Sequence, residues 1–438
     1  MMRHLLWTDW CLLLVFGLGS LALLWSLRKP PVRSAWISLL SQPVAASALV
    51  FLFFFIGIGT MDSIRLTPAH TLLDAVLSPL GDQYEKTYSV PFALRSFSPD
   101  IHVVQGRTKE IFSRLTYPSQ FLKNTEEKQH FMCAGFLHAC WMSMLLTLGM
   151  ALLVLRMQTY FVGRSKLNSA WISALMTFGL IVCVLISTYD WSRALHVLGT
   201  GKIGEDILYY TVKSIRTGLV IGLLTTLFMM PWALLLGIAA GYFGGLVDDI
   251  IQYIYTTLSS IPGVLLITAS VLSMQTYIAN HPDTFTSLAE SADARLLALC
   301  GILGITSWTS LCRVLRAETL KLREMEYVSA AKVLGSGSFK IIVKHLLPNV
   351  MHLVLITLVL DFSFLVLAEA VLSYVGVGVS PMTISWGNMI NAARLELARD
   401  PLVWWPVLAA FGVMFTLVLA SNLFADAVRD AFDPHHVR

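Results

Sequence analysis

Long uninterrupted runs of apolar residues constrain this chain more than any other feature of its sequence. Nine runs approach or exceed the length of α-helix, about 20 residues, that crosses the hydrocarbon core of a bilayer. A backbone inside lipid must bond all its polar groups internally, so each run predicts a helix. The expected spans are 10–27, 36–58, 131–155, 170–188, 217–240, 250–274, 296–312, 351–375 and 402–424. The predicted fold class is an all-α integral membrane protein with about nine transmembrane helices.

Composition argues against a soluble globular fold. Hydrophobic residues make up 56% of the chain and charged residues 13%, against roughly 45–50% and about 25% in an average soluble domain. The net charge is only +4 and the basic residues are scattered over the loops, so no nucleic-acid partner is expected. The six cysteines lie in or at the ends of apolar runs, which argues against a disulfide framework.

The distribution of Lys and Arg orients the spans. With a cytoplasmic C-terminus, the cytoplasmic loops hold 15 of the 31 basic residues, seven of them in the loop 313–345. Short basic loops stay in the cytoplasm, so the N-terminus is expected outside. Eight other basic residues lie in 59–130, a long extracytoplasmic insertion that the rule discounts.

The cytoplasmic loop 313–350 carries the pattern that is most informative about function. Its first half repeats apolar or small residues at i, i+3, i+4 and i+7, which predicts a short helix with one apolar face. These residues are Tyr327, Ala330, Ala331 and Leu334. Small alanines on that face would allow close approach by another protein. The alternative is an ordinary amphipathic connector.

The second half of the loop predicts a turn and another helix. Gly335 stands where a left-handed C-terminal cap is wanted. Ser336 or Ser338 can cap the second helix, and Pro348 is expected to break the chain before the next span. A helix–turn–helix of this kind outside the membrane suits docking.

This loop resembles the signature of the dipeptide and oligopeptide permeases of bacterial ABC importers. That signature reads roughly EAA, a short spacer, Gly, a longer spacer and then Leu-Pro. The matching positions here are Ser329-Ala330-Ala331, Gly335 and Leu347-Pro348. Ser329 replaces the Glu of the motif, so a charge contact at that position is not implied.

Further stretches follow the same family in order. After the first core span comes an extracytoplasmic motif, whose matching residues are His196, Leu198, Gly199, Thr200, Gly204 and Asp206. Gly201 and Glu205 stand where the family has Asp and Arg. The other matches are Ala-Gly-Tyr-Phe-Gly-Gly at 240–245 with Asp248, Ala-Glu-Ala at 368–370, Ser-Trp-Gly-Asn-Met at 385–389 and a C-terminal tail at 428–434.

The resemblance implies a C-type permease with a six-span core, 166–438. The preceding region, 1–165, has no counterpart and contributes three extra spans and the insertion. The implied partners are a second homologous permease, two ABC ATPase subunits that bind 325–348, an extracytoplasmic solute-binding protein and membrane lipid, in a bacterial inner membrane. Peptides are the implied solute.

The chain itself has no phosphate loop of the form G-x-x-x-x-G-K-[ST]. ATP and Mg²⁺ are therefore expected on the ATPase subunits, and neither a catalytic residue nor a cofactor is expected in this chain. The competing hypothesis is a membrane enzyme or sensor built on the extra spans and the insertion.

Two carboxylates lie inside the apolar run 351–375. Asp361 and Glu369 are spaced to fall on one broad side of a helix. Carboxylates inside a membrane are costly and are functional candidates by default. Both are candidates for the translocation pathway, and Glu369 has the alternative role of bonding a neighbouring helix.

No metal site is expected. The nearest group of ligand-type residues is His130, Cys133, His138 and Cys140. Its two cysteines are two helical turns apart, roughly 10 Å, which is too far for both to bind one ion.

Overall fold

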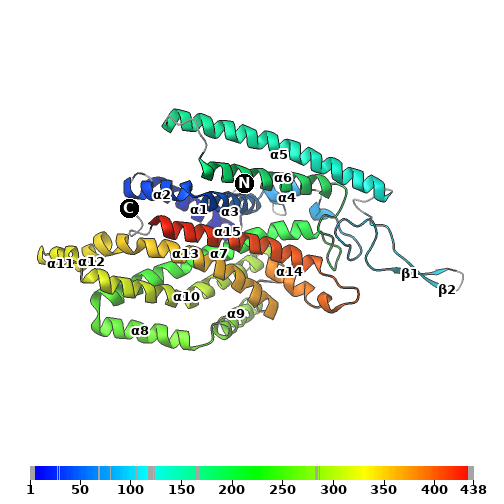
Figure 1. Cartoon of the computed structure of the whole chain (residues 1–438). Helices are drawn as coiled ribbons and strands as arrows, with labels where there is room; N and C mark the ends of the chain where they lie inside the picture. The colour runs from blue at the N-terminus through cyan, green and yellow to red at the C-terminus, as the bar shows by residue number, and fades with distance from the viewer. Residues whose placement is uncertain are drawn as a thin grey trace. The chain divides into compact units, whose positions relative to one another are not determined.

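The computed structural model of the chain is built mainly of helices (Figure 1). It describes residues 5–26, 28, 30–67, 70–78, 80–104, 107–116, 122, 124–162, 168–281, 285 and 287–432. Within these residues, eight helices are long and apolar enough to cross a membrane. The all-α membrane fold predicted from the sequence is confirmed.

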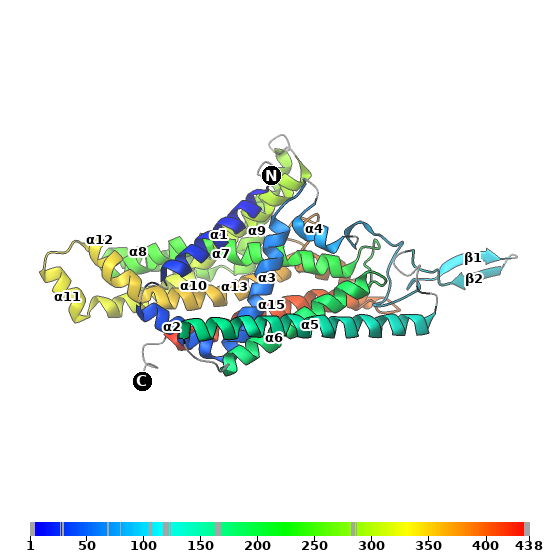
Figure 2. The same ribbon diagram turned by 90° about the horizontal axis from the view of Figure 1, so that it is seen from above.

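One compact unit comprises Met1–Leu5, Trp36–Thr217 and Ile384–Phe424. Its helices α5 and α6 lie side by side in both views, and α3 packs on α6 (Figure 1, Figure 2). A two-stranded antiparallel hairpin extends beyond the N-terminal end of α5 (Figure 2). The elements are α3 (Pro43–Ser63), α4 (Leu72–Leu77), η2 (Leu80–Asp82), β1 (Asp100–Val104), β2 (Arg107–Ile111), α5 (Thr125–Val162), α6 (Ser169–Ser192), the start of α7 (Ile207–Phe243), α14 (Trp386–Ala393), η6 (Glu396–Ala398) and most of α15 (Trp405–Phe432).

The other compact unit comprises Leu6–Ala35, Gly218–Thr383 and Ala425–Arg438. Its helix α10 contacts α1, α8, α9 and α13, which makes α10 the central helix of this unit. The elements are α1 (Trp7–Ser26), the rest of α7, α8 (Gly245–Ser260), α9 (Gly263–Asn280), α10 (Leu288–Arg323), α11 (Glu326–Val333), α12 (Ser338–Ile341), the π-helical turn η5 (Ile342–Leu346) and α13 (Leu347–Val375). The short α2 (Pro30–Ser41) belongs partly to each unit.

The bounds of two expected spans are wrong because proline divides the apolar runs, although each run contributes one candidate span. The run 36–58 is split where α2 ends at Ser41 and α3 begins at Pro43, since proline fits the first position of a helix but cannot continue one. The run 250–274 is split at Pro262 into α8 and α9, and of these two helices α9 is the candidate span. The first expected span is the helix α1, whose apolar part, Trp7–Ala22, is shorter than the eight candidate spans.

Glycines set the distance between α7 and α10. A Cβ on Gly237 would lie 2.8 Å from the carbonyl oxygen of Cys312 and 2.9 Å from Cβ of Leu315. A Cβ on Gly241, one turn later, would lie 2.8 Å from the carbonyl oxygen of Arg316. Small residues four positions apart let two helices approach closely. In lipid this close packing matters because no hydrophobic force drives helices together.

We expect Gly241→Leu to destabilise the protein by about 1–3 kcal/mol, because the added side chain has to push two backbones apart. The matched control is Gly301→Leu on α10, where an added Cβ would meet nothing within 4 Å. Thermal unfolding of the two full-length variants in one detergent measures the difference. Equal melting temperatures of the two variants would show that α7 and α10 do not pack so closely at Gly241 that only glycine fits.

Candidate functional site

The loop after α10 forms the predicted helix and left-handed turn. Helix α11 ends at Val333, and Gly335 follows with φ +76°. The N–H of Gly335 donates to the carbonyl oxygen of Lys332, and the N–H of Ser336 donates to that of Ala331, both at 3.0 Å. These are the two bonds of a Schellman motif, and the positive φ is the conformation that glycine adopts at the least cost.

The inward side of α11 differs from the expected docking face. Val328 and Ala331 are buried in a cluster with Tyr242 of α7, Leu311 of α10 and Val350 of α13. The expectation that Ala331 belongs to an outward docking face is therefore wrong. In a helix of only eight residues, sequence spacing alone does not show whether Ala331 faces the partner or the neighbouring helices. Packing against α7, α10 and α13 decides that it is buried. Tyr327, Ala330 and Leu334 do lie on the exposed side.

Polar and aromatic contacts hold α11 against its neighbours. The side-chain amide of Asn349 donates to the hydroxyl of Tyr327 at 2.9 Å. The ammonium of Lys332 lies 5.4 Å from the centroid of the Tyr242 ring, a cation–π contact. These contacts tie α11 to the start of α13 and the end of α7.

The helix after the turn is continuous with the following span, so the expected break at Pro348 is wrong. The chain stays helical from Ser338 to Val375 and widens into the π turn η5 just before Leu347 and Pro348. Proline lacks an N–H and its ring crowds the carbonyl of Lys344, four residues earlier. The wider turn accommodates both effects. The expected serine cap is also wrong, because α12 begins after Gly337.

Three large apolar side chains project from this loop. Val333 is 88% exposed, Leu334 83% and Phe339 81%. We call them the apolar tip. Large apolar side chains that gather at an exposed surface are typical of a protein interaction site.

The family-like motif 196–206 folds into a tight loop between α6 and α7. Nδ1 of His196 lies 2.6 Å from Oδ2 of Asp206, and both side chains are buried. Gly199 and Gly204 have φ of +73° and +80°. Thr200 forms a β-bridge with Asp206, and its carbonyl oxygen accepts a bond from the indole N–H of Trp405 at 3.0 Å. The structure thus brings the predicted residues together, with Leu198 half-buried beside them.

Part of the insertion 59–130 bonds this motif through Glu85 and Ser89, a pairing that the sequence did not predict. The N–H of Glu85 donates to the carbonyl oxygen of Gly204 at 3.0 Å, and the N–H of Thr200 donates to that of Ser89 at 3.1 Å. Oε1 of Glu85 lies 3.8 Å from Nε2 of His196. His196 therefore has a carboxylate on each side.

These carboxylates control the protonation of His196. Burial alone would lower its pKa, but the hydrogen bonds and charges of Asp206 and Glu85 outweigh burial and raise the pKa to about 9. The imidazolium is the state that pairs with both neighbours. It fastens the insertion to the motif.

Glu205 and Gly201 are related by space and not by charge, because the Glu205 carboxylate occupies the room that a side chain at position 201 would need. The Glu205 carboxylate accepts a bond from the N–H of Ile203 at 2.9 Å. A side chain at position 201 would collide with that carboxylate. Burial raises the pKa of Glu205.

Other family-like stretches have definite structural roles. Ser385 caps α14 by accepting from the N–H of Asn388, and Trp386 donates to the carbonyl oxygen of Thr211 at 3.0 Å. In the other unit, Asp248 accepts two bonds from Arg316 at 2.5 and 2.6 Å. The C-terminal stretch 428–434 extends past residue 432, beyond the described residues.

The two carboxylates of α13 have different surroundings. Glu369 is buried and accepts a bond from the hydroxyl of Ser373 on its own helix at 2.8 Å. Oδ2 of Asp361 is buried and has no hydrogen-bond partner among the described residues. An unpaired carboxylate oxygen in this setting is costly, so Asp361 is the stronger functional candidate.

The histidines and cysteines near the start of α5 do not converge. His138 pairs with Asp190 at 2.8 Å, and Sγ of Cys140 lies 3.8 Å from Sγ of Cys183. Cys133 is exposed. In the described part of the chain, these residues form no group that could hold a metal ion.

Comparisons with known proteins point to one family. Residues 233–436 match the family model of the binding-protein-dependent transport system inner membrane component. The chain is 32% identical to the dipeptide transport system permease protein DppC of Lactococcus lactis over 239 residues, which are 55% of this chain and 64% of that protein. It is 30% identical to the oligopeptide transport system permease protein OppC of Mycobacterium bovis (55% and 76%) and 31% identical to the glutathione transport system permease protein GsiD of Pectobacterium atrosepticum (55% and 72%). The chain thus spans slightly less than two thirds of the Lactococcus protein.

We expect Gly335→Val to destabilise the turn by about 1–2 kcal/mol, because a side chain disfavours the left-handed conformation. Gly337→Val is the matched control, since Gly337 has φ −65° and open space around it. Hydrogen–deuterium exchange of residues 326–341 in the full chain measures local opening. Faster exchange in both variants or in neither would contradict the assignment of the turn.

We expect the closure over His196 to weaken as pH rises. The raised pKa of His196 contributes up to about 3 kcal/mol of stability, fully present below about pH 6.5 and lost as pH rises to about 9. Exchange protection of residues 85–92 should fall over that range in the wild type. In His196→Gln it should be low and independent of pH.

The control for this experiment is His138→Gln, because the exposed pair of His138 with Asp190 contributes little. It should keep the wild-type pH dependence. If exchange protection of residues 85–92 in the wild type did not change with pH, the pairing of charged His196 with Asp206 and Glu85 would be contradicted.

Proposed function

Because the chain belongs to the family of binding-protein-dependent transport system inner membrane components, we propose that it forms half of the translocation pathway of an ATP-driven importer. The observation that carries this proposal is the loop of α11 and α12, with its left-handed turn at Gly335 and its apolar tip. The same loop supports a transport subunit over a membrane enzyme or sensor, since it offers a docking surface.

We propose small peptides as the solute. The relatives are named for transport of dipeptides, oligopeptides and glutathione. An extracytoplasmic solute-binding protein would deliver the peptide, and a second homologous permease would complete the pathway.

The proposed coupling surface is the apolar tip, Val333, Leu334 and Phe339. Two ATPase subunits, carrying ATP and Mg²⁺, would each bind such a loop from one of the two permeases. Burying a Val, Leu or Phe side chain in a partner's pocket stabilises a complex by about 1.5–3 kcal/mol each. Tyr327, Leu347 and Pro348 would position the tip, because they lie where α11 folds back on α13.

The proposed orientation in the bacterial inner membrane has the N-terminus outside and the C-terminus in the cytoplasm. The basic residues of 313–345 support it, because short basic loops stay on the cytoplasmic side. Asp361 is the proposed pathway residue on α13, and Glu369 is proposed to stabilise that helix through Ser373.

We expect Leu334→Glu combined with Phe339→Glu to leave the chain inserted but to weaken capture of the ATPase subunits by roughly 100-fold or more. A carboxylate forced into an apolar interface is desolvated without a partner, which costs several kcal/mol. Copurified subunits, ATPase stimulation by loaded binding protein and peptide uptake measure the loss.

Leu395→Glu is the control, because Leu395 is equally apolar and exposed but lies in the loop between α13 and α15, on the opposite side in the proposed orientation. It should leave ATPase capture unchanged. If the double variant also kept normal capture, stimulation and uptake, the loop would be a connector and the proposed coupling would be wrong.

A further inference from the structure

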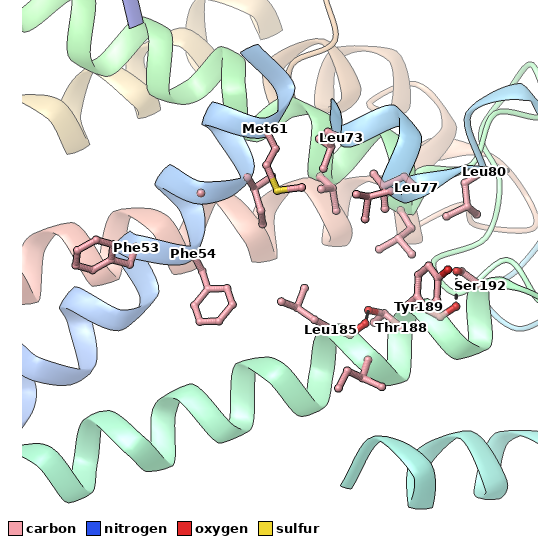
Figure 3. Close-up of a pocket in the computed structure, with 16 residues that line it drawn as sticks. Phe53, Phe54, Met61, Leu73, Leu77, Leu80, Leu185, Thr188, Tyr189 and Ser192 are labelled. Atoms are coloured by element: carbon pink, nitrogen blue, oxygen red, sulfur yellow. Dashed lines mark hydrogen bonds between the residues drawn. The ribbon is translucent and has the colours of Figure 1, made fainter. Parts of the chain in front are cut away.

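An apolar pocket of about 560 Å³ lies between α3, α4 and α6 (Figure 3). Phe53, Phe54 and Met61 line it from α3, and Leu185 lines it from α6. The start of α7 adds Leu208 and Val212. The proposed transport function assigns no role to this pocket.

The depth of the pocket matches one leaflet of a bilayer. Its lining on α3 runs over 53–61, which is about 12 Å of helix, and a leaflet's hydrocarbon layer is about 15 Å thick. Phe54 and Phe178, with ring centroids 5.8 Å apart, pack against each other at the deep end. The pocket therefore extends from near the middle of α3 to its C-terminal end, and along the last third of α6.

Helix α4 is held so that it covers the pocket. Asp74 closes a capping box with Thr71 and accepts bonds from Tyr209 at 2.8 Å and Lys213 at 2.7 Å. The apolar residues of the same short helix line the pocket, as Leu73 and Leu77 show in Figure 3. The contacts of Asp74 with α7 on one side of α4 thus hold the apolar residues of α4 against the pocket on its other side.

The outer end of the pocket carries polar groups, and a cation outside its lining, Arg193, lies beside it. Tyr189 lines this end and is 44% exposed, with Thr188 and Ser192 beside it (Figure 3). The guanidinium of Arg193 lies 5.9 Å from the centroid of the Tyr189 ring. The neighbouring Asp190 is paired with His138 of α5.

We propose that this pocket binds one acyl chain of a glycerophospholipid whose phosphate lies at Arg193 and Tyr189. The wall is apolar over the depth of a leaflet, and Arg193, which lies beside the outer end on the ring of Tyr189, complements the charge of the phosphate. A transmembrane helix of a neighbouring protein is too wide, since 12 Å of a helix about 10 Å across fills roughly 900 Å³. A lipid here would wedge the extra helix α3 against the core helix α6.

The test is photolabelling of the full chain in nanodiscs. The probe is a phosphatidylglycerol with a diazirine at the end of one acyl chain, and adducts are mapped by mass spectrometry. Because the diazirine is at the end of the chain, we expect adducts concentrated at the deep end of the pocket, in 53–57 and near Leu185. Gly57→Leu should reduce them about tenfold, which is the change expected when roughly two buried methylene groups lose their place. An added Cβ at Gly57, which lines the pocket, meets nothing within 4 Å, so the variant fills the pocket without strain.

Two controls separate a site from ordinary contact with lipid. Gly149→Leu makes the same change on α5, also in open space, and should leave the adducts unchanged. Arg193→Gln should reduce labelling by the phosphatidylglycerol probe but not by a diacylglycerol with the same diazirine chain. Adducts spread evenly over the lipid-facing helices, or equal labelling of the Gly57 and Gly149 variants, would overturn the proposal. Equal effects of Arg193→Gln on both probes would overturn the phosphate contact.

Discussion

The ion pair between Asp74 and Lys213 is the contact on which the arrangement of the N-terminal region depends. Its atoms are 2.7 Å apart, and Asp62 lies 4.0 Å from the same ammonium. The side chains of Asp74 and Asp62 are buried and that of Lys213 is largely buried, so breaking this cluster would leave a buried charge. The cluster fixes α4 at the start of α7. It thereby shapes the apolar pocket below α4 and sets the path of the chain toward Glu85.

From that anchor the insertion reaches the family-like motif of the core. Glu85 bonds Gly204 through its backbone and faces His196 through its side chain, so the added segment and the motif share one buried charge cluster. A partner that approaches this loop meets the insertion as well as the motif. Under the proposed function, the insertion is therefore placed to alter how solute is received, and its grip on the loop depends on the charge of His196.

The sequence predicted what lipid and local backbone chemistry dictate. Spans follow from the need to bond every backbone group inside a bilayer, and the left-handed turn follows from glycine at position 335. Three features depend on contacts that no local pattern records. The inward side of Ala331 is chosen by packing against α7, the π turn before Pro348 by the continuation of α13, and the position of Glu85 by a pairing more than one hundred residues away in sequence. The division at Pro262 was readable, since proline is a strong helix boundary, but the apolar run masked it.

The continuity of helix from Ser338 to Val375 gives the proposed coupling a physical route. An α-helix is stiff along its axis because each turn is bonded to the next, so force applied at Phe339 would reach Asp361 through continuous helix. The π turn η5 lies between them and is the one stretch where the bonding pattern of this helix changes. Such turns are frequent at functional sites, since a shift of register there rotates the helix beyond it. Under the proposed function, docking at the tip would turn the carboxylate of Asp361 and would link ATPase binding to the solute path through one continuous helix.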